Sequence, residues 1–362
     1  MEIFALAYIA FSILIFMGFA ILDISKALGR KNKEEKQRIK RREPKTLVIL
    51  PCKGVDLTMD KNLSSIKDQD YGNFDLVAVV DNGYDEAVPR IRKAGIKYII
   101  SESRCDKCSG KVRAIVTALE KFRRYEVYVI ADSDITVDKE WLRAIVSPLE
   151  DKRIGLSTMF PLFYPVSGFW SNVKHVWGFV GDAMMEDERT RFGWGGSMAF
   201  RKELLDSKSM EFLRNSKYSV SDDICITKIT EMKKLGIAYV KEHRPVVNSS
   251  ESFRSLSEWA DRQTALTLLG KRDNLRYGIA YYGGEAFLLV SGIALAAYVS
   301  PLFLVFFAHY LRSLIVAYRR AIAKSPYLVP ITLIMPFFYL ANLIAASRMN
   351  SIIWRGRKYR LG

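Results

Sequence analysis

Acidic side chains that directly follow short apolar runs are the first candidates for chemistry in this sequence. Asp132 and Asp134 form an Asp-Ser-Asp turn after the apolar residues 127–131, and Asp81 follows the similar run 75–80. Two carboxylates on one turn offer hard oxygen ligands to Mg²⁺ or Mn²⁺, which proteins hold with one or two carboxylates plus substrate phosphates. The turn therefore indicates a site for a metal-bound nucleoside diphosphate, although an acid after a strand is also a common turn former.

Two lysines occupy comparable positions. Lys53 lies just beyond the apolar run 46–50, and Lys111 follows Gly110 at the start of a predicted helix. Backbone N–H groups and the helix dipole favour an anion at a helix start. Lys111 is therefore a candidate contact for the same diphosphate, with a solvated lysine as the alternative.

The elements that must position these side chains alternate along the chain, with strands predicted at 46–50, 75–80, 97–100 and 127–131 and helices at 62–68 and 111–122. Such alternation predicts an α/β fold with a mostly parallel sheet covered by helices on both faces. Ligands of these sheets bind at the carboxyl ends of the strands. Lys53, Asp81 and the Asp132/Asp134 pair are all predicted at that edge.

The charge of the chain is strongly basic but unevenly distributed. There are 55 Lys or Arg residues against 39 Asp or Glu, which gives a formal net charge of +16. The excess lies in segments that flank apolar runs, above all 26–45 and 348–362, while 46–282 is close to neutral. Because no single basic face could follow a phosphate backbone, we do not expect a nucleic-acid partner.

Uncharged apolar runs at 3–22, 286–308 and 328–347 are each long enough to cross a hydrocarbon core of about 30 Å. The first lacks a preceding basic region, so we expect an uncleaved anchor rather than a signal peptide. The basic residues that follow it place the central domain in the cytosol by the positive-inside rule. In the C-terminal region we expect two spans, with a tight hairpin plus one span as the alternative.

We therefore predict an integral protein of the cell membrane. Its predicted parts are a transmembrane anchor at 1–25, a basic linker at 26–45, a cytosolic domain with interfacial segments at 46–282, a C-terminal transmembrane region at 283–347 and a basic cytosolic tail at 348–362. Disulfides are not expected to persist in the cytosol. Cys105 and Cys108 also lack the further ligands that a zinc site would need, so we expect them in an ordinary surface loop, with a redox or metal role as the alternative.

Several short segments occur in a specific order: Lys53-Gly-Val-Asp56, Asn62-Leu-x-Ser65 with Tyr71, Asp81, Ala131-Asp-Ser-Asp-Ile-Thr-Val137, Gly195-Gly-Ser-Met-Ala-Phe-Arg-Lys-Glu-Leu-Leu-Asp206, Ser221-Asp-Asp223 and Ile353-Trp-Arg-Gly-Arg-x-Tyr-Arg-Leu361. Together they resemble the membrane-bound family 2 type glycosyltransferases, in particular the ceramide glucosyltransferase-like branch. The resemblance covers nearly the whole chain.

The resemblance implies a GT-A-type, Rossmann-like fold with transmembrane helices at both ends. It also implies roles for individual residues: Lys53, Asp81 and Asp132 at the nucleotide-sugar, Asp132 and Asp134 at the metal, Gly195, Gly196 and Ser197 on the acceptor side, and Asp223 as general base beside Asp222, with Arg262 as a further catalytic residue. To these we add Lys111 at the nucleotide-sugar, from its position at a helix start, and Trp194 on the acceptor side, with a solvated loop as the alternative for Trp194. One motif departs from the family pattern, because Arg262 is followed by Gln263-Thr-Ala-Leu266 and the expected Arg-Trp pair is absent.

The function that the resemblance implies is an inverting transfer of a sugar from a nucleotide-diphosphate sugar, a UDP-sugar in this branch, to a hydroxyl of a membrane lipid. The partners are then the donor, the lipid acceptor and the membrane, and the cofactor is Mg²⁺ or Mn²⁺. A polyprenyl phosphate is the alternative acceptor. A non-catalytic membrane scaffold that retains the fold is the alternative from another class, and the presence of every donor-side acid argues against it.

Overall fold

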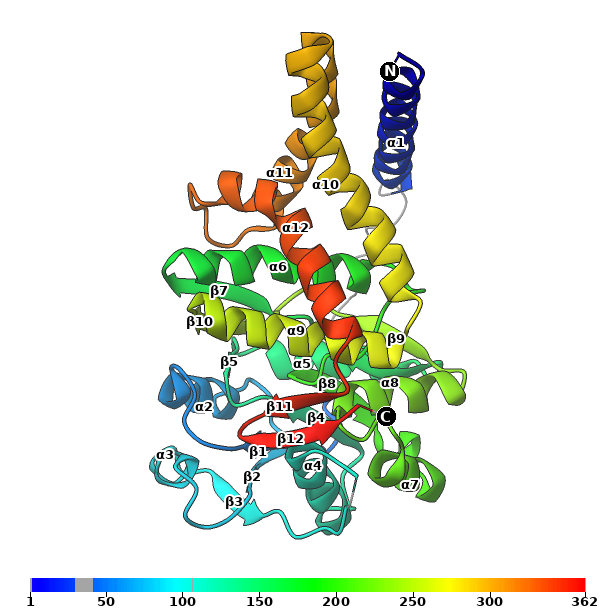
Figure 1. Cartoon of the computed structure of the whole chain (residues 1–362). Helices are drawn as coiled ribbons and strands as arrows, with labels where there is room; N and C mark the ends of the chain where they lie inside the picture. The colour runs from blue at the N-terminus through cyan, green and yellow to red at the C-terminus, as the bar shows by residue number, and fades with distance from the viewer. Residues whose placement is uncertain (1, 30–41, 106, 362) are drawn as a thin grey trace. The chain divides into compact units, whose positions relative to one another are not determined.

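The computed structural model describes residues 2–29, 42–105 and 107–361 (Figure 1). Of the basic linker predicted at 26–45, residues 30–41 lie outside the described part. The chain divides into two compact units. Unit 1 comprises residues 1–36, 168–179 and 251–348, and unit 2 comprises residues 37–167, 180–250 and 349–362.

Unit 2 contains a seven-stranded sheet in the order β3-β2-β1-β4-β8-β6-β9, with bounds β1 Thr46–Cys52, β2 Phe74–Val80, β3 Lys97–Ile100, β4 Val127–Ala131, β6 Ile154–Thr158, β8 Ser197–Arg201 and β9 Gly236–Tyr239. The first four strands in this order are parallel, and β8 runs antiparallel to β4 and β6. The predicted mostly parallel α/β sheet is therefore confirmed.

Two smaller sheets complete unit 2. Strands β5 (Ile135–Thr136), β10 (Val246–Ser250) and β7 (Leu162–Ser167) form one of them. The other is a hairpin of β11 (Ser351–Trp354) and β12 (Arg357–Arg360) at the C-terminal end of the chain. This hairpin belongs to the same compact unit as the large sheet, although unit 1 supplies all of residues 251–348 between them.

The helices of unit 2 are α2 (Met59–Lys67), α3 (Ala87–Lys93), α4 (Gly110–Lys121), α5 (Trp141–Val146), α7 (Ser207–Asn215) and α8 (Asp222–Met232), with short 3₁₀ turns η2 (Ser147–Glu150) and η3 (Lys202–Leu204). Strand β1 is buried on both faces, as its near-continuous apolar sequence predicts. Leu47 and Ile49 pack in one core cluster with residues of α4 and α8. Val48 and Leu50 are equally buried and alternate to the opposite face.

Unit 1 is helical and consists of α1 (Glu2–Gly29), the start of α6 (Phe169–Glu186), α9 (Phe253–Gly270), α10 (Asn274–Tyr298), the 3₁₀ segment η4 (Pro301–Phe307), α11 (Ala308–Arg320) and α12 (Leu328–Ser347). Helix α1 contacts α10 and α11, and α12 packs on α9 and α10 (Figure 1). His309 bridges Asp23 and Glu285, at 2.9 Å and 2.6 Å, and so connects α11 to α1 and α10.

Four helical segments of unit 1 are long and apolar enough to cross a membrane: 3–25, 274–298, 301–320 and 328–347. Three of these candidate segments lie in the C-terminal region, where two spans stay our prediction. The third candidate arises at Pro301, which begins η4 after α10 has ended at Tyr298. A proline cannot donate a backbone hydrogen bond and interrupts a continuous helix, so the long apolar stretch is divided into two helical segments.

The prediction of free thiols at Cys105 and Cys108 was wrong. The structure joins them in a disulfide, whereas Cys52 and Cys225 are free and buried. The Cα atoms of Cys105 and Cys108 are 5.6 Å apart, a separation that a disulfide spans readily. Our prediction relied on the expected compartment and preferred a surface loop to a redox role for this Cys-x-x-Cys pair.

Candidate active site

The carboxyl ends of the parallel strands bring the predicted donor-side residues to one edge of the sheet. Lys53 follows β1, Asp81 follows β2, and Asp132 and Asp134 follow β4. Cys52 pairs in register with Val80, and Ile49 with Ile130, so these strands end at neighbouring levels. The sequence prediction of a shared edge agrees with this arrangement.

The turn that carries Asp132 and Asp134 is fixed by Asn62 of α2. The fully buried Asn62 side chain donates to the Ser133 carbonyl at 3.1 Å and accepts from the Thr136 hydroxyl at 2.7 Å. The Ser133 hydroxyl in turn donates to Asp56. These hydrogen bonds join the β1–α2 region to the turn after β4. They fix the backbone of the turn that carries the two carboxylates.

Lys111 is the centre of a charged cluster beside this turn. Its Nζ lies 2.7 Å from Asp132 Oδ1 and 3.2 Å from Asp222 Oδ2, and it donates to the Gly195 carbonyl at 3.1 Å. Burial alone would lower the pKa of Lys111, but the two carboxylates outweigh burial and raise the pKa above its usual value. Lys111 is therefore a charged link between α4, β4 and α8, rather than a solvated lysine at a helix start.

Glycines at 195 and 196 make room for this cluster. A Cβ atom at Gly195 would lie 2.6 Å from Asp222 Oδ2 and 2.9 Å from Lys111 Nζ. A Cβ atom at Gly196 would lie 2.1 Å from the Trp194 ring. The Gly196 carbonyl also accepts from the backbone N–H of Asp132 at 3.1 Å. The glycine pair thus lets the start of β8 approach both the turn that carries Asp132 and Asp134 and the acids of α8.

Asp222 and Asp223 occupy the first turn of α8, where carboxylates are stabilised by the helix dipole. The Asp222 side chain is 3% exposed and faces Lys111. Burial raises the pKa of Asp222 to about 6, against the opposing effect of Lys111. Asp223 is half-buried, and its Oδ1 accepts from the Ser221 hydroxyl and from the Ile224 N–H. Burial also raises the pKa of Asp223.

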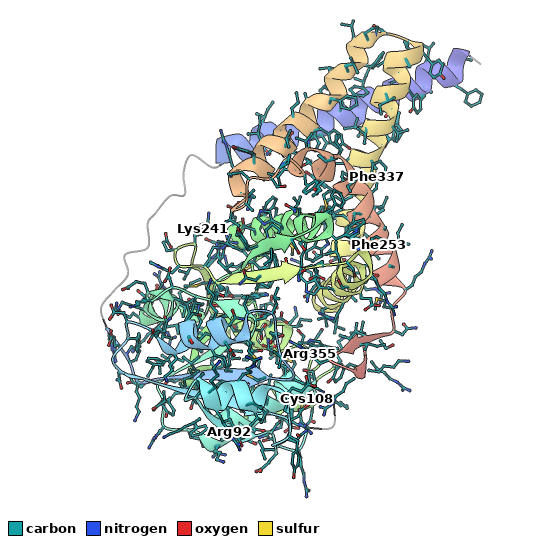
Figure 2. All side chains as sticks on the ribbon, turned by 90° about the vertical axis from the view of Figure 1, so that its left-hand side faces the viewer. Arg92, Cys108, Lys241, Phe253, Phe337 and Arg355 are labelled. Atoms are coloured by element: carbon teal, nitrogen blue, oxygen red, sulfur yellow. A yellow bond between two sulfur atoms is a disulfide. The ribbon has the colours of Figure 1, made fainter. Side chains whose placement is uncertain are left out.

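A second charged cluster surrounds Asp81. Lys53 Nζ and Arg357 Nη2 each lie 3.1 Å from Asp81 Oδ2, and Arg113 Nη2 lies 3.2 Å from Oδ1. Arg355, which lies on the same C-terminal hairpin (Figure 2), pairs with Asp56. We had assigned no role to Arg113, Arg355 or Arg357. The Trp-Arg-Gly-Arg segment was the available signal, but its sequence alone does not tell which part of the fold it contacts.

Two further predicted site residues, Ser197 and Arg262, lie in different units of the chain. The hydroxyl of Ser197 accepts from the Trp141 indole N–H at 2.8 Å, and its side chain is fully buried in the core of unit 2. Arg262 lies on α9, which belongs to unit 1. On the same helix, Trp259 packs on Trp177 with ring centroids 4.8 Å apart and lies beneath the ammonium of Lys174.

The acids at the edge of the sheet have the chemistry of a divalent-cation site. Asp132 keeps 30% of its side-chain exposure, and its Oδ1 already accepts a cation, the Lys111 ammonium. Within the described residues, no group of three or more His, Cys, Asp or Glu side chains forms a complete metal cage. A pair of carboxylates that relies on ligand phosphates for further oxygens suits Mg²⁺ or Mn²⁺.

Comparisons with known proteins lead to the same fold. The model of glycosyl transferase family 21 matches residues 9–362. A mannosyltransferase from Pyrobaculum calidifontis, solved with GDP-Man and Mn²⁺, is 18% identical, with a TM-score of 0.58, covering 93% of this chain and 97% of that chain. Glucosyl-3-phosphoglycerate synthase from Mycobacterium tuberculosis, solved with phosphoglyceric acid, is 17% identical, with a TM-score of 0.44, covering 66% and 85%. The comparison with curated proteins gives no significant match.

Proposed function

Since the chain belongs to glycosyl transferase family 21 and is a glycosyltransferase that uses nucleotide-sugars, we propose that its acceptor is a hydroxyl group of a membrane lipid. The observation that carries this proposal is the presence of four helices long and apolar enough to cross a membrane in the same chain as the donor-side acids. An enzyme held at the bilayer by its own helices meets lipid acceptors without extracting them into water. A UDP-sugar is the proposed donor.

We propose a single displacement with inversion at the anomeric carbon. The lipid hydroxyl attacks this carbon from the side opposite the diphosphate, a carbon–oxygen bond forms, and the bond to the diphosphate breaks. The hydroxyl proton passes to Asp223, and the bonding electrons leave with the nucleoside diphosphate. A positioned base of this kind contributes typically 10²- to 10⁴-fold to the rate.

The environments of the two acids of α8 support Asp223 as the base. Asp222 is enclosed by Lys111 and is 3% exposed, so an acceptor hydroxyl has little access to it. Asp223 is half-buried, and both of its hydrogen bonds are made by Oδ1, which leaves Oδ2 for the acceptor proton. Its raised pKa makes it a stronger proton acceptor than an ordinary aspartate.

Asp134 and Asp132 would hold the divalent cation, with Asp222 and Lys111 behind Asp132. When bound, such an ion neutralises negative charge on the departing diphosphate. Lys111 lies against Asp132 and holds that carboxylate in place through a 2.7 Å contact. Lys111 would thus act on the donor through Asp132, in addition to any direct contact with the diphosphate.

We further propose that unit 2 faces the cytosol at the cell membrane. Ten Lys or Arg residues between positions 26 and 45 follow the first apolar helix, and basic residues close to a span favour the cytosolic side. The donor site would then face the compartment on that side of the bilayer.

Label transfer tests this function. Membranes that contain the full chain are incubated with Mn²⁺, a total lipid extract and one labelled nucleotide-sugar at a time, with UDP- and GDP-sugars in the panel. We expect label from one donor to enter the organic phase, and no such transfer with membranes that contain the Asp223→Asn variant. Mild acid treatment then separates the two acceptors, because a sugar phosphodiester of a polyprenyl phosphate is cleaved and a lipid glycoside is retained. Label that stays entirely in the aqueous phase would contradict a lipid acceptor.

A further inference from the structure

We propose that the C-terminal hairpin β11–β12 is part of the donor site, and that Arg357 binds the diphosphate of the nucleotide-sugar together with Lys53 and Arg113. The inference rests on the proposed function, because it assigns further residues to the same donor site. It is carried by the position of the hairpin within unit 2, where Arg357 reaches the acid that follows β2.

The hairpin has a tight turn that determines which side chains share a face. Trp354 and Arg357 form the last pair of the ladder, and Arg355 and Gly356 between them have φ values of 49° and 76°. Two consecutive positive φ angles are typical of a type I′ turn, which suits the twist of a two-stranded hairpin. Side chains alternate along β12, so Arg357 and Tyr359 lie on one face and Lys358 and Arg360 on the other.

The face with Arg357 and Tyr359 is the one that meets the donor edge. Arg357 Nη2 lies 3.1 Å from Asp81 Oδ2, and the Tyr359 hydroxyl accepts from the backbone N–H of Gly110 at 3.2 Å. A Cβ atom at Gly110 would lie 3.1 Å from Arg357 Nη1, so the guanidinium group lies directly over the first residue of α4. Lys358 and Arg360 are exposed.

The charge balance at Asp81 argues for a ligand. One carboxylate carries a single negative charge, yet Lys53, Arg113 and Arg357 all lie within 3.2 Å of it. A single pair would be enough to attach the hairpin. The Asp81 side chain is 10% exposed, whereas those of Lys53, Arg113 and Arg357 are 35%, 31% and 42% exposed. The excess positive charge therefore remains accessible, at the edge where the sheet binds its ligands.

A nucleoside diphosphate matches this excess. Guanidinium groups form charge-assisted, frequently bidentate hydrogen bonds with phosphate oxygens. Arg357 can also exchange partners at low cost, because its present contact with Asp81 leaves Lys53 and Arg113 on the same carboxylate. Arg355, at the turn of the hairpin and paired with Asp56, would attach the hairpin to the loop after β1.

The test compares Arg357→Gln with Lys358→Gln in the full-length protein in detergent, by titration with UDP and with GDP in the presence of Mn²⁺. Both substitutions remove one positive charge from β12, but only Arg357 lies on the face toward Asp81. We expect the wild type to bind one of the two nucleotides, Arg357→Gln to raise the Kd about tenfold or more, and Lys358→Gln to change it less than about twofold. Equal Kd values for Arg357→Gln and the wild type would overturn the inference, whereas a wild type that binds neither nucleotide would overturn the proposed function itself.

A second measurement needs no variant and so does not depend on how Arg357→Gln folds. Trypsin cleaves after Arg355, Arg357, Lys358 and Arg360, and the release of C-terminal peptides from the wild type can be followed by mass spectrometry. We expect release to slow several-fold when Mn²⁺ and the bound nucleotide are present, because Arg357 then holds the nucleotide. Unchanged release at nucleotide concentrations that saturate the protein would show that the hairpin does not take part in donor binding.

Discussion

The charged cluster around Lys111 in unit 2 and the charged cluster around His309 in unit 1 differ in how far they are exposed to solvent. In unit 2, Lys111 joins Asp132 and Asp222, and Asp132 retains 30% side-chain exposure. In unit 1, His309 joins Asp23 and Glu285, and these side chains are 2%, 14% and 9% exposed. Arg312 also belongs to the unit 1 cluster, because its Nη1 lies 2.6 Å from Asp23 Oδ1.

The difference follows from the elements that supply the residues. The members of the first cluster come from positions just after a strand or at the start of a helix, where side chains point beyond the end of the sheet. Those of the unit 1 cluster come from three helices, with Asp23 and Glu285 inside α1 and α10 and His309 in the first turn of α11, and they face one another. A buried charge is costly unless it is paired. In unit 1 the pairing is complete and joins helices, whereas in unit 2 one side of the cluster stays accessible to a ligand.

The largest effect is expected at the accessible side of the unit 2 cluster. Asp132→Asn and Asp134→Asn each remove one charged oxygen ligand while keeping the side-chain shape, and metal coordination contributes several kcal/mol to catalysis. We expect turnover to fall to the level of membranes without the enzyme, with no response to added Mn²⁺. Label transfer across a Mn²⁺ titration measures both.

Asp60→Asn is the matched control, since Asp60 is an exposed acid of α2 that pairs with Arg90 and Lys93. It should leave turnover unchanged. Normal turnover and a normal Mn²⁺ response in the Asn variants at 132 and 134 would show that these acids do not hold the metal.

The next effect separates the two acids of α8. Asp223→Asn should leave nucleotide affinity nearly unchanged and reduce turnover by roughly two to four orders of magnitude, because it removes the base. Asp222→Asn should reduce turnover less. Single-turnover rates and nucleotide titrations of both variants measure this difference. A parallel loss of donor binding in Asp223→Asn, or full turnover, would place the base elsewhere.

The pH dependence of stability provides a check on Asp222 itself. Its pKa of about 6 is above the ordinary 3.8, so the native state binds more protons than the unfolded state between these values. The stabilisation that this provides is present below about pH 4 and is lost as the pH rises through 6. Asp222→Asn stays neutral throughout, so its unfolding temperature should exceed that of the wild type above pH 6 and approach it near pH 4.

A substitution in the unit 1 cluster around His309 should change the stability of the protein rather than its nucleotide binding. His309→Leu leaves Asp23 and Glu285 without their shared partner, and breaking a buried pair in this way typically costs about 3–5 kcal/mol. We expect a lower unfolding temperature in detergent with unchanged nucleotide affinity of the folded protein. His243→Leu, which removes a partly exposed histidine paired with Asp138, should change the unfolding temperature much less. Reduced nucleotide affinity in His309→Leu would contradict a purely structural role of the unit 1 cluster.

The donor edge could be predicted from the sequence because each of its residues follows an apolar run. Lys53, Asp81, Asp132 and Asp134 come directly after strands, and parallel strands align their carboxyl ends. The four predicted strands began and ended within two residues of the prediction, since each is a short run rich in β-branched and aromatic residues. Local pattern and sheet geometry were sufficient for these residues.

The remaining features depend on contacts between distant segments. Arg357 meets Asp81 across most of the chain, and no local pattern indicates that a basic tail folds back as a hairpin. The separation of Asp222 from Asp223 depends on which of them meets Lys111, and this follows from the start of α8 and from the space at Gly195. The antiparallel strand β8 likewise carries no sequence sign of its direction.

The hairpin also has a topological consequence. Residues 349–362 belong to the same compact unit as residues 37–167 and 180–250. If this unit lies on one side of the membrane, as we propose, the number of crossings between Ser250 and Met349 is even, although this interval contains three segments long and apolar enough to cross. We therefore predict that one of α10, the 301–320 segment and α12 stays on the surface or turns back within the bilayer. A reporter at Lys358 and one at Asp151 must accordingly be reached from the same face of the membrane.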